Sequence, residues 1–208
     1  MIEYTQIKRR GRLLTSRVTE GMFFLRRFIG APRQVGSVMP SSPYLTRAIM
    51  DRIDWDSALN IAELGAGTGV FTRVLVQKMP EEGRLMVFEI DPALKAMIEK
   101  EHEGLSVYGD ACELPKIMET LEVSRLDCII SSLPFAVLPP RMTAAILDAI
   151  DASLKPDGKL IAYQYSRHMK SYFEKRFESV KISFVLRNLP PAFVYECSSV
   201  RRKKKQEK

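Results

Sequence analysis

The feature that most restricts the fold is an alternation of strand-like and helix-like segments between residues 58 and 165. Expected strands at residues 58–64, 84–90, 105–108, 126–131 and 159–165 alternate with expected helices at 70–79, 93–100, 113–121 and 141–154. This alternation is typical of a parallel sheet with helices on both faces. Residues 180–186 and 193–200 read as two further strands joined by a short loop, which predicts a hairpin at the sheet edge. The chain is therefore expected to form a doubly wound α/β fold.

The charge of the chain is concentrated at its two ends. The 208 residues carry a net charge of +7, of which residues 1–33 contribute +6 and residues 201–208 contribute +5. The segment 34–200 is therefore mildly acidic, at −4. Basic ends on such a body suit docking to an anionic surface, either lipid or nucleic acid. We expect a basic N-terminal segment (1–33), one catalytic domain (34–200) and a basic tail (201–208).

The N-terminal segment has the pattern of a basic amphipathic helix. Its apolar residues fall on one stripe at helical spacing, namely Ile7, Leu14, Val18, Met22, Leu25 and Ile29. Such a helix could lie on a membrane surface or pack on its own domain, and the pattern favours neither. No stretch approaches the ~20 apolar residues that span a bilayer. Three scattered cysteines indicate reduced cytoplasmic thiols, and no metal site is expected.

A glycine-rich turn follows the first expected strand. The segment 63–70 reads Glu-Leu-Gly-Ala-Gly-Thr-Gly-Val and leads into a helix. Glycines let a ligand approach the backbone, but a dinucleotide-binding turn would carry Gly or Ala where this chain has Val70. Glu63 would repel a pyrophosphate and attract a cationic amino acid. Glu89 ends the second strand, where it can accept ribose hydroxyls, and Asp110 follows the third, where it can bond an adenine amino group.

This set of residues resembles the S-adenosylmethionine-dependent methyltransferases over roughly residues 35–200. The resemblance implies a Rossmann-like fold with a seven-stranded, mostly parallel sheet and a reversed last strand in the terminal hairpin. It implies S-adenosyl-L-methionine as methyl donor and S-adenosyl-L-homocysteine as product. The expected cofactor-binding residues are Glu63, Gly65, Ala66, Gly67, Thr68, Glu89, Ile90, Asp110, Ala111 and Ser131.

The segment Ser131-Ser132-Leu133-Pro134-Phe135 ends the fourth strand, where ligands of open parallel sheets bind. Adenine N6-methyltransferases carry Asn or Asp at the start of this motif, so their base-reading amide is absent here. Together with Val-Gly-Ser-Val-Met-Pro-Ser-Ser at 35–42 and Arg-Asn-Leu-Pro-Pro-Ala at 187–192, the segment resembles bacterial phospholipid N-methyltransferases. These convert phosphatidylethanolamine to phosphatidylcholine at the inner face of the cell membrane. The expected substrate-binding residues are Ser41, Ser132, Leu133, Pro134, Arg187 and Asn188.

The resemblance implies a cytoplasmic enzyme that is peripheral to the membrane and binds an anionic lipid surface through its basic ends. Tyr163, Tyr165 and His168 lie near the end of the fifth strand and are the candidate catalytic residues. Two alternatives remain at this point: an RNA or small-amine methyltransferase on the same fold, and a membrane-binding module without catalysis. Nucleic acid is the less favoured partner, because the basic segments contain few aromatic residues for base stacking.

Overall fold

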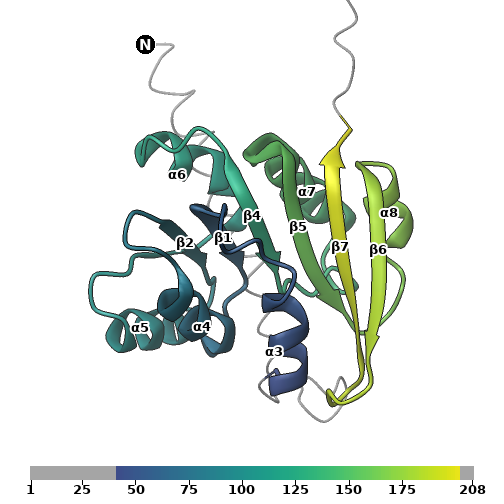
Figure 1. The fold of residues 1–208 in the computed structure, drawn as a ribbon, viewed down its shortest axis with the longest axis horizontal. Coiled ribbons are helices and arrows are strands. Elements are labelled where there is room, and N and C mark those ends of the chain that lie inside the picture. The colour runs from purple at the N-terminus through teal and green to yellow at the C-terminus, as the bar shows by residue number, and fades with distance from the viewer. Residues whose placement is uncertain (1–40, 202–208) are drawn as a thin grey trace, which may run out of the picture.

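Parallel pairing of the central strands sets the architecture (Figure 1). The computed structural model describes residues 41–201. These residues form one seven-stranded sheet in the order β3-β2-β1-β4-β5-β7-β6. Its strands are β1 (Asn60–Leu64), β2 (Arg84–Phe88), β3 (Val107–Tyr108), β4 (Leu126–Ser131), β5 (Leu154–Gln164), β6 (Phe177–Val185) and β7 (Ala192–Val200). Strands β1 to β5 pair in parallel, whereas β7 is antiparallel to both β5 and β6. The predicted mostly parallel sheet with a reversed last strand is confirmed.

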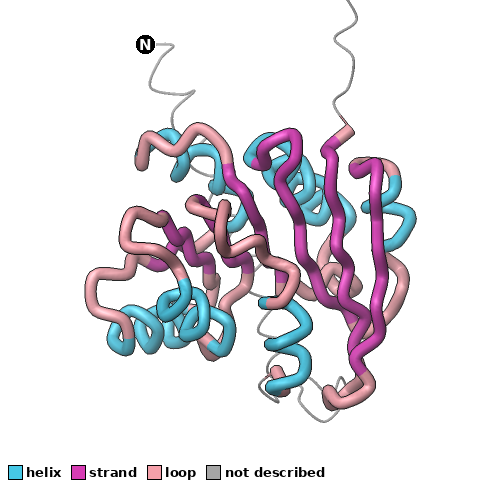
Figure 2. Tube along the Cα trace, viewed as in Figure 1, coloured by secondary structure: helices cyan, strands magenta, loops and turns pink. Residues whose placement is uncertain are grey.

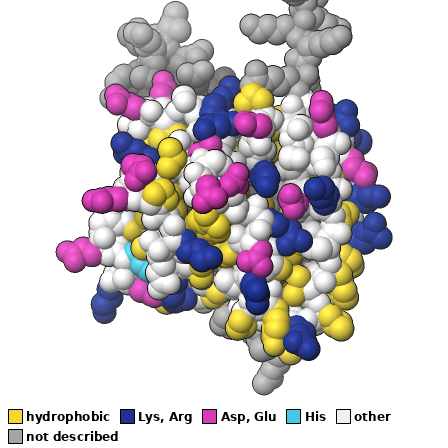
Figure 3. Space-filling view, in the orientation of Figure 1, with side chains coloured by type: hydrophobic (Ala, Val, Ile, Leu, Met, Phe, Trp, Pro, Cys, Tyr) yellow, Lys and Arg dark blue, Asp and Glu magenta, His cyan; other side chains and the backbone are white. Residues whose placement is uncertain are grey.

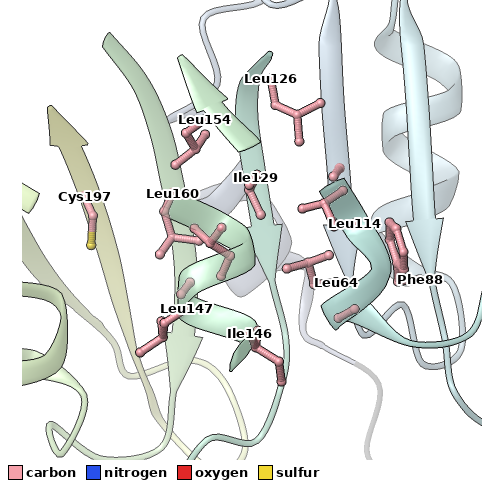
Figure 4. Packing of buried hydrophobic residues seen from close by; sticks show 14 of the residues in the cluster. Leu64, Phe88, Leu114, Leu126, Ile129, Ile146, Leu147, Leu154, Leu160 and Cys197 are labelled. Atoms are coloured by element: carbon pink, nitrogen blue, oxygen red, sulfur yellow. The ribbon is translucent and has the colours of Figure 1, made fainter. Parts of the chain in front are cut away.

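Helices cover both faces of this sheet (Figure 2). They are α3 (Pro43–Met50), α4 (Val70–Lys78), α5 (Pro92–Glu101), α6 (Leu114–Thr120), α7 (Pro140–Ser153), α8 (Lys170–Glu174) and a 3₁₀ helix at Ala111–Glu113. Successive residues of a strand point to opposite faces, so a strand covered on both sides is apolar throughout. In β4, Ile129 packs in the cluster that includes α6, α7 and α8, whereas Ile130 packs with α3 and α4. Figure 4 shows the first of these clusters.

Two details of the chain differ from the sequence prediction. Residues 155–158, which lie between the expected helix 141–154 and the expected strand 159–165, belong to β5, where the register with β4 shifts between Leu126 and Cys128. Lys155 pairs with Asp127, which fastens this irregular stretch to the sheet. The short helix α8 was not predicted, because its five residues are too few to show a helical period. The first of these differences lies at the start of β5, away from the edge at which the parallel strands end.

The connection between β6 and β7 lies at that same edge. Gln164, the last residue of β5, pairs with Phe193, and Val185 pairs with Ala192. Residues 186–191 therefore follow directly beyond the carboxyl ends of the parallel strands. Asn188 also ties this connection to the start of α3, because its Oδ1 accepts a hydrogen bond from the Ser42 backbone N–H at 2.9 Å. The loop and α3 thus border the candidate site.

Parts of the predicted organisation lie outside the described residues. These are the N-terminal helix, the proposed boundary at residues 33–34, and residues 202–208 of the tail. Arg201 belongs to the described part, and its backbone N–H donates to the Arg176 carbonyl at 2.7 Å. Within residues 41–201, no helix has both the length and the apolar character that a membrane crossing requires.

Candidate functional site

The glycine turn between β1 and α4 forms the centre of the site. The N–H groups of Gly65 and Ala66 both donate to the Phe88 carbonyl, at 2.8 and 3.0 Å. Gly65, Gly67 and Gly69 have φ angles of +81°, +58° and +75°, a region that residues with a side chain rarely adopt. A Cβ at Gly65 would lie 2.9 Å from Leu133 Cδ2, whereas a Cβ at Gly67 would meet no atom within 4 Å. The turn is packed behind Gly65 and open above Gly67, so a ligand can approach there.

Glu89 holds this turn from the end of β2. Its Oε2 accepts a hydrogen bond from the Gly67 N–H at 2.7 Å, and its Oε1 accepts one from the Asp91 N–H at 2.8 Å. Burial raises the pKa of Glu89, and the hydrogen bonds from these backbone groups oppose that shift. The carboxylate expected to receive ribose hydroxyls is therefore fixed beside the open part of the turn. Ile90 follows it and is half-buried.

Glu63 is a buried carboxyl group in β1, two residues before the glycine turn. It is 0% exposed, and its Oε2 accepts a hydrogen bond from the Thr72 hydroxyl of α4 at 2.7 Å. Its Oε1 has no partner among the described residues. Burial raises the pKa of Glu63 to about 7; the Thr72 bond lowers it, and the charge of Glu89 raises it further. This carboxyl group is thus poised to ionise fully when a positive charge binds nearby. Thr72 was not anticipated from the sequence.

Two further predicted cofactor residues lie beyond β3. The Oδ1 of Asp110 accepts a hydrogen bond from the Cys112 N–H at 2.9 Å and caps the 3₁₀ helix. Ala111 is 7% exposed and packs in the core. Since β3 pairs with β2, this turn lies next to Glu89, whose own N–H donates to the Tyr108 carbonyl at 2.8 Å. Asp110 keeps a free carboxylate edge for the predicted contact with an adenine amino group.

The two serines after β4 differ in their surroundings. Ser131 is 0% exposed, and its Oγ accepts a weak hydrogen bond from the Leu133 N–H at 3.4 Å. Ser132 is half-buried, and its N–H donates to the Leu64 carbonyl at 2.9 Å, which extends the pairing of β4 with β1. A cofactor contact by Ser131 stays a prediction, and its buried hydroxyl is directed to the Leu133 N–H. Ser132 is the serine that can face a ligand.

Gln164 fixes the segment that follows these serines. Its Nε2 donates to the Leu133 carbonyl at 2.8 Å and to the Tyr163 carbonyl at 2.7 Å. The side chain is 4% exposed, so both bonds are shielded from water. Pro134 is half-buried, and Phe135 packs edge-on against Phe173 at 6.4 Å between ring centroids. The segment 133–135 is thus held by Gln164 at Leu133 and by Phe173 at Phe135. Gln164 is a positioning residue that the sequence pattern did not reveal.

Tyr163 connects three hydroxyl groups beside the glycine turn. Its hydroxyl lies near the hydroxyls of Ser41, Tyr165 and Ser132, close enough for these groups to affect its pKa. Its ring packs edge-on against Phe71 of α4 at 6.0 Å, and against Tyr165 at 5.9 Å. Burial is the largest of the effects that raise the pKa of Tyr163, so the group stays a neutral phenol at physiological pH. Tyr163 can orient a polar ligand but cannot serve as a proton-accepting phenolate. The structure brings the predicted residues Ser41, Ser132, Tyr163 and Tyr165 together.

His168 lies apart from this hydroxyl cluster. It is exposed, and its Nδ1 shares a hydrogen bond of 2.8 Å with the Ser166 hydroxyl. Partial burial lowers the pKa of His168, so its ring is neutral at pH 7. Among residues 41–201, no hydrogen bond or ring contact joins His168 to Tyr163. A catalytic role for His168 stays a prediction without geometric support.

Arg187 and Asn188, the two residues expected to hold a headgroup, have different surroundings. Asn188 is 5% exposed; its Oδ1 bonds the Ser42 N–H, and its Nδ2 donates to the Pro190 carbonyl at 2.7 Å. Both of its polar atoms are therefore used to shape the loop. Arg187 is exposed and stacks over the Tyr44 ring at 5.1 Å, which leaves most of its donors available.

Within the described chain, no group of three or more His, Cys, Asp or Glu side chains could hold a metal ion.

Comparison with known proteins gives one curated relative and many structural neighbours. No protein-family model matches the chain. An ornithine lipid N-methyltransferase of Singulisphaera acidiphila is 29% identical over 187 residues, which cover 86% of this chain and 95% of that protein. The sequence similarity therefore extends over nearly the whole length of the relative.

Several structural neighbours are named as methyltransferases, all at low sequence identity. A precorrin-6Y C5,15-methyltransferase from Geobacter metallireducens has a TM-score of 0.61 at 14% identity, over 78% of this chain and 91% of that one. The N-methyltransferase NodS from Bradyrhizobium japonicum, in complex with S-adenosyl-L-homocysteine, has a TM-score of 0.58 at 13% identity, over 76% and 88%. An O-methyltransferase from Bacillus cereus, also in complex with S-adenosyl-L-homocysteine, has a TM-score of 0.61 at 14% identity, over 86% and 90%. The chain has the Rossmann-like methyltransferase fold.

Proposed function

We propose that this protein transfers a methyl group from S-adenosyl-L-methionine to the primary amine of a membrane lipid. The observation that carries the proposal is Glu63, a buried carboxyl group with one oxygen unpartnered among the described residues, placed beside the open glycine turn. A cationic ligand would stabilise its charge. The lipid N-methyltransferase from Singulisphaera acidiphila, similar over 86% of this chain, supports a lipid amine as acceptor.

The residues at the carboxyl ends of β1, β2 and β3 fit S-adenosyl-L-methionine. Glu63 favours the positive end of this molecule through its charge, Glu89 would receive the ribose hydroxyls, and Asp110 would bond the adenine amino group. Gly65, Ala66, Gly67 and Thr68 would line its methionine part, with Ile90 and Ala111 against the adenine. When bound, the cofactor would supply a sulfonium methyl group, whose carbon a nitrogen lone pair would attack while the electrons of the broken carbon–sulfur bond stay on the departing sulfur.

The hydroxyl cluster would orient the attacking nitrogen. A methyl transfer needs nitrogen, carbon and sulfur in line, so most of the catalytic effect comes from alignment and exclusion of water. The oxygens of Ser132 and Tyr163 can accept N–H bonds from the amine and turn its lone pair toward the methyl group. Since Tyr163 stays a phenol, the ammonium form of the lipid must lose its proton to water before it enters. The Tyr165 ring packs edge-on against the Tyr163 ring and helps to hold it in place.

The headgroup would be held at the loop between β6 and β7. Arg187 can pair with an anion through charge-assisted hydrogen bonds, and phosphate and carboxylate both suit its planar group. Phosphatidylethanolamine offers an amine with a phosphate, and an ornithine lipid offers an amine with a carboxylate. Our proposal includes the stepwise methylation of phosphatidylethanolamine toward phosphatidylcholine at the inner face of the cell membrane. The ornithine headgroup is the other acceptor with the same chemistry.

Radiolabelled S-adenosyl-L-methionine separates these acceptors. The protein is incubated with vesicles that contain phosphatidylethanolamine, with vesicles that contain ornithine lipid, with vesicles of phosphatidylglycerol, which has no amine, and with RNA. We expect label in lipid only where the lipid carries an amine. Label in phosphatidylethanolamine supports this phospholipid as the acceptor. Label in ornithine lipid alone would mean that ornithine lipid, and not phosphatidylethanolamine, is the acceptor. Label in RNA without any in lipid would overturn the proposed function.

Substitution at the cofactor turn should weaken cofactor binding. Glu89→Ala removes the carboxylate that fixes Gly67, and Gly67→Val places a β-branched residue at a φ of +58°. Each variant should bind S-adenosyl-L-methionine at least ~10-fold more weakly by calorimetry, because a hydrogen bond to a charged group contributes roughly 1.5–3 kcal/mol. Glu103→Ala, which removes an exposed glutamate, serves as the control. Unchanged affinity in both folded variants would show that the site has been misplaced.

Glu63 should make cofactor binding depend on pH. Its pKa is about 7 in the ligand-free protein, and a bound cation lowers this pKa, so the ionised form binds more tightly. Affinity should therefore rise with pH up to about 7, by at most ~10-fold per pH unit. Calorimetry between about pH 5.5 and 7.5 measures the profile and the proton released. Glu63→Gln should bind more weakly at the upper end and give a flatter profile; equal slopes for variant and parent would contradict this role.

Tyr163→Phe should slow methyl transfer without loss of the cofactor. The substitution keeps the ring against Phe71 but removes the hydroxyl that lies near Ser41 and Ser132. We expect kcat for lipid methylation to fall at least ~10-fold with little change in cofactor affinity, since small misplacements are costly in an in-line displacement. Tyr172→Phe, at an exposed tyrosine of α8, is the matched control. Equal kcat for the parent and Tyr163→Phe would remove Tyr163 from the reaction.

A further inference from the structure

The most exposed apolar side chains of the described residues gather at one end of the molecule. Leu186 is 71% exposed and Leu189 is 67% exposed, and both lie in the loop between β6 and β7. Phe184, at the end of β6, is 54% exposed, and Tyr44, at the start of α3, is 51% exposed. Together with Arg187, these residues form what we call the tip surface: Tyr44, Phe184, Leu186, Arg187 and Leu189. Figure 3 shows hydrophobic and basic side chains at this lower end.

The tip surface is built on fixed contacts. Asn188 lies beneath it and bonds the Ser42 N–H at 2.9 Å and the Pro190 carbonyl at 2.7 Å. The Arg187 guanidinium stacks on the Tyr44 ring at 5.1 Å, and the Phe184 ring contacts the Phe193 ring at 4.9 Å. Leu186 and Leu189 are therefore presented outward by a loop whose buried polar residue is satisfied. Exposure of two leucines on such a loop has no role in the packing of the domain.

The segments that form the tip surface carry a single charge. Between residues 182 and 195 the only charged residue is Arg187, and residues 41–46 carry none. On α3 the first charged residue is Arg47, which pairs with Asp51. The tip surface thus combines leucines, aromatic rings and a cation without any carboxylate.

We propose that the tip surface inserts into the headgroup region of a phospholipid bilayer. Leucine and phenylalanine side chains enter the boundary of the hydrocarbon, tyrosine suits the headgroup level, and arginine meets lipid phosphates. Four apolar side chains are few for a stable protein interface, which involves about 20–30 residues on each side. They are enough for a shallow insertion that adds to other contacts. A bilayer is therefore the occupant that the composition and charge fit.

Insertion there would turn the reaction site toward the membrane. The loop 186–191 follows directly beyond the pairs Gln164–Phe193 and Val185–Ala192, at the edge where Tyr163 and the glycine turn lie. A lipid amine could then reach the hydroxyl cluster while its acyl chains remain in the bilayer. This consequence for catalysis rests on the proposed function, whereas the insertion itself does not.

Tryptophan fluorescence tests the insertion directly. The chain has a single tryptophan, Trp55, so Trp55→Phe gives a silent background in which Leu189→Trp reports on the tip. Vesicles of phosphatidylcholine with phosphatidylglycerol should shift its emission to the blue and protect it from a water-soluble quencher. Tyr172→Trp in the same background should not respond. An unshifted Leu189→Trp would overturn the proposal. So would emission that is already blue without vesicles, which would mean that the chain itself or a second copy covers the tip.

Sedimentation with the same vesicles gives a second measurement. Leu186→Ser with Leu189→Ser should bind vesicles at least ~10-fold more weakly, because two apolar side chains no longer leave water. The control Met97→Ser with Tyr172→Ser, at two other exposed apolar positions, should bind as the parent does. Unchanged vesicle binding by the tip variant would contradict the proposal.

Methylation of a detergent-dispersed lipid amine separates this inference from the proposed function. The tip variant should keep parental cofactor affinity and parental activity on the dispersed lipid, while its activity on vesicles falls. If the parent inserts into vesicles but methylates no lipid, the tip surface stands and the proposed function fails. If the parent methylates dispersed lipid but Leu189→Trp stays in water on vesicles, the proposed function stands and the insertion fails.

Discussion

The arrangement of the site depends on how the turn after β1 is fastened to β2. One carbonyl, that of Phe88, accepts hydrogen bonds from both Gly65 and Ala66, and the carboxylate of the next residue, Glu89, bonds Gly67. These bonds hold three consecutive residues of the turn in place. Because all three glycines of the turn have positive φ angles, the turn could not form with ordinary side chains at those positions. The open space above Gly67 is a consequence of this fastening.

Two buried carboxyl groups flank this turn and have different environments. Glu89 receives backbone N–H bonds on both oxygens, which favour its charged form against the effect of burial. Glu63 has one bond, from Thr72, and an oxygen without a partner among the described residues, so burial dominates and raises its pKa. The same residue type therefore serves two purposes. Glu89 organises the backbone, and Glu63 keeps an electrostatic preference that a cationic ligand can satisfy.

The reversed strand β7 brings distant parts of the chain to the same edge. Because β7 runs antiparallel to β5, its start and the loop before it lie beside the end of β5. Asn188 then links this loop to the start of α3, across 146 residues of sequence. The cofactor turn, the hydroxyl cluster around Tyr163 and the apolar tip thus face the same side. A soluble cofactor and a membrane-bound amine could meet there without any large movement of the domain.

The sequence by itself determined the fold class, the order of most elements and the position of the glycine turn. Alternating hydrophobic periods and glycine spacing are local properties, so they can be read without coordinates. What the tertiary structure decided depends on the register between strands. Strand alternation places Ser131 inside the protein and Ser132 toward the site, and the pairing of β4 with β5 brings Gln164 to the Leu133 carbonyl. Asn188 reads as a ligand in sequence but is bonded within the loop, because its partner Ser42 belongs to a distant helix. Local pattern names the candidates, and only the packing of distant segments shows which of their atoms remain free to bind a ligand.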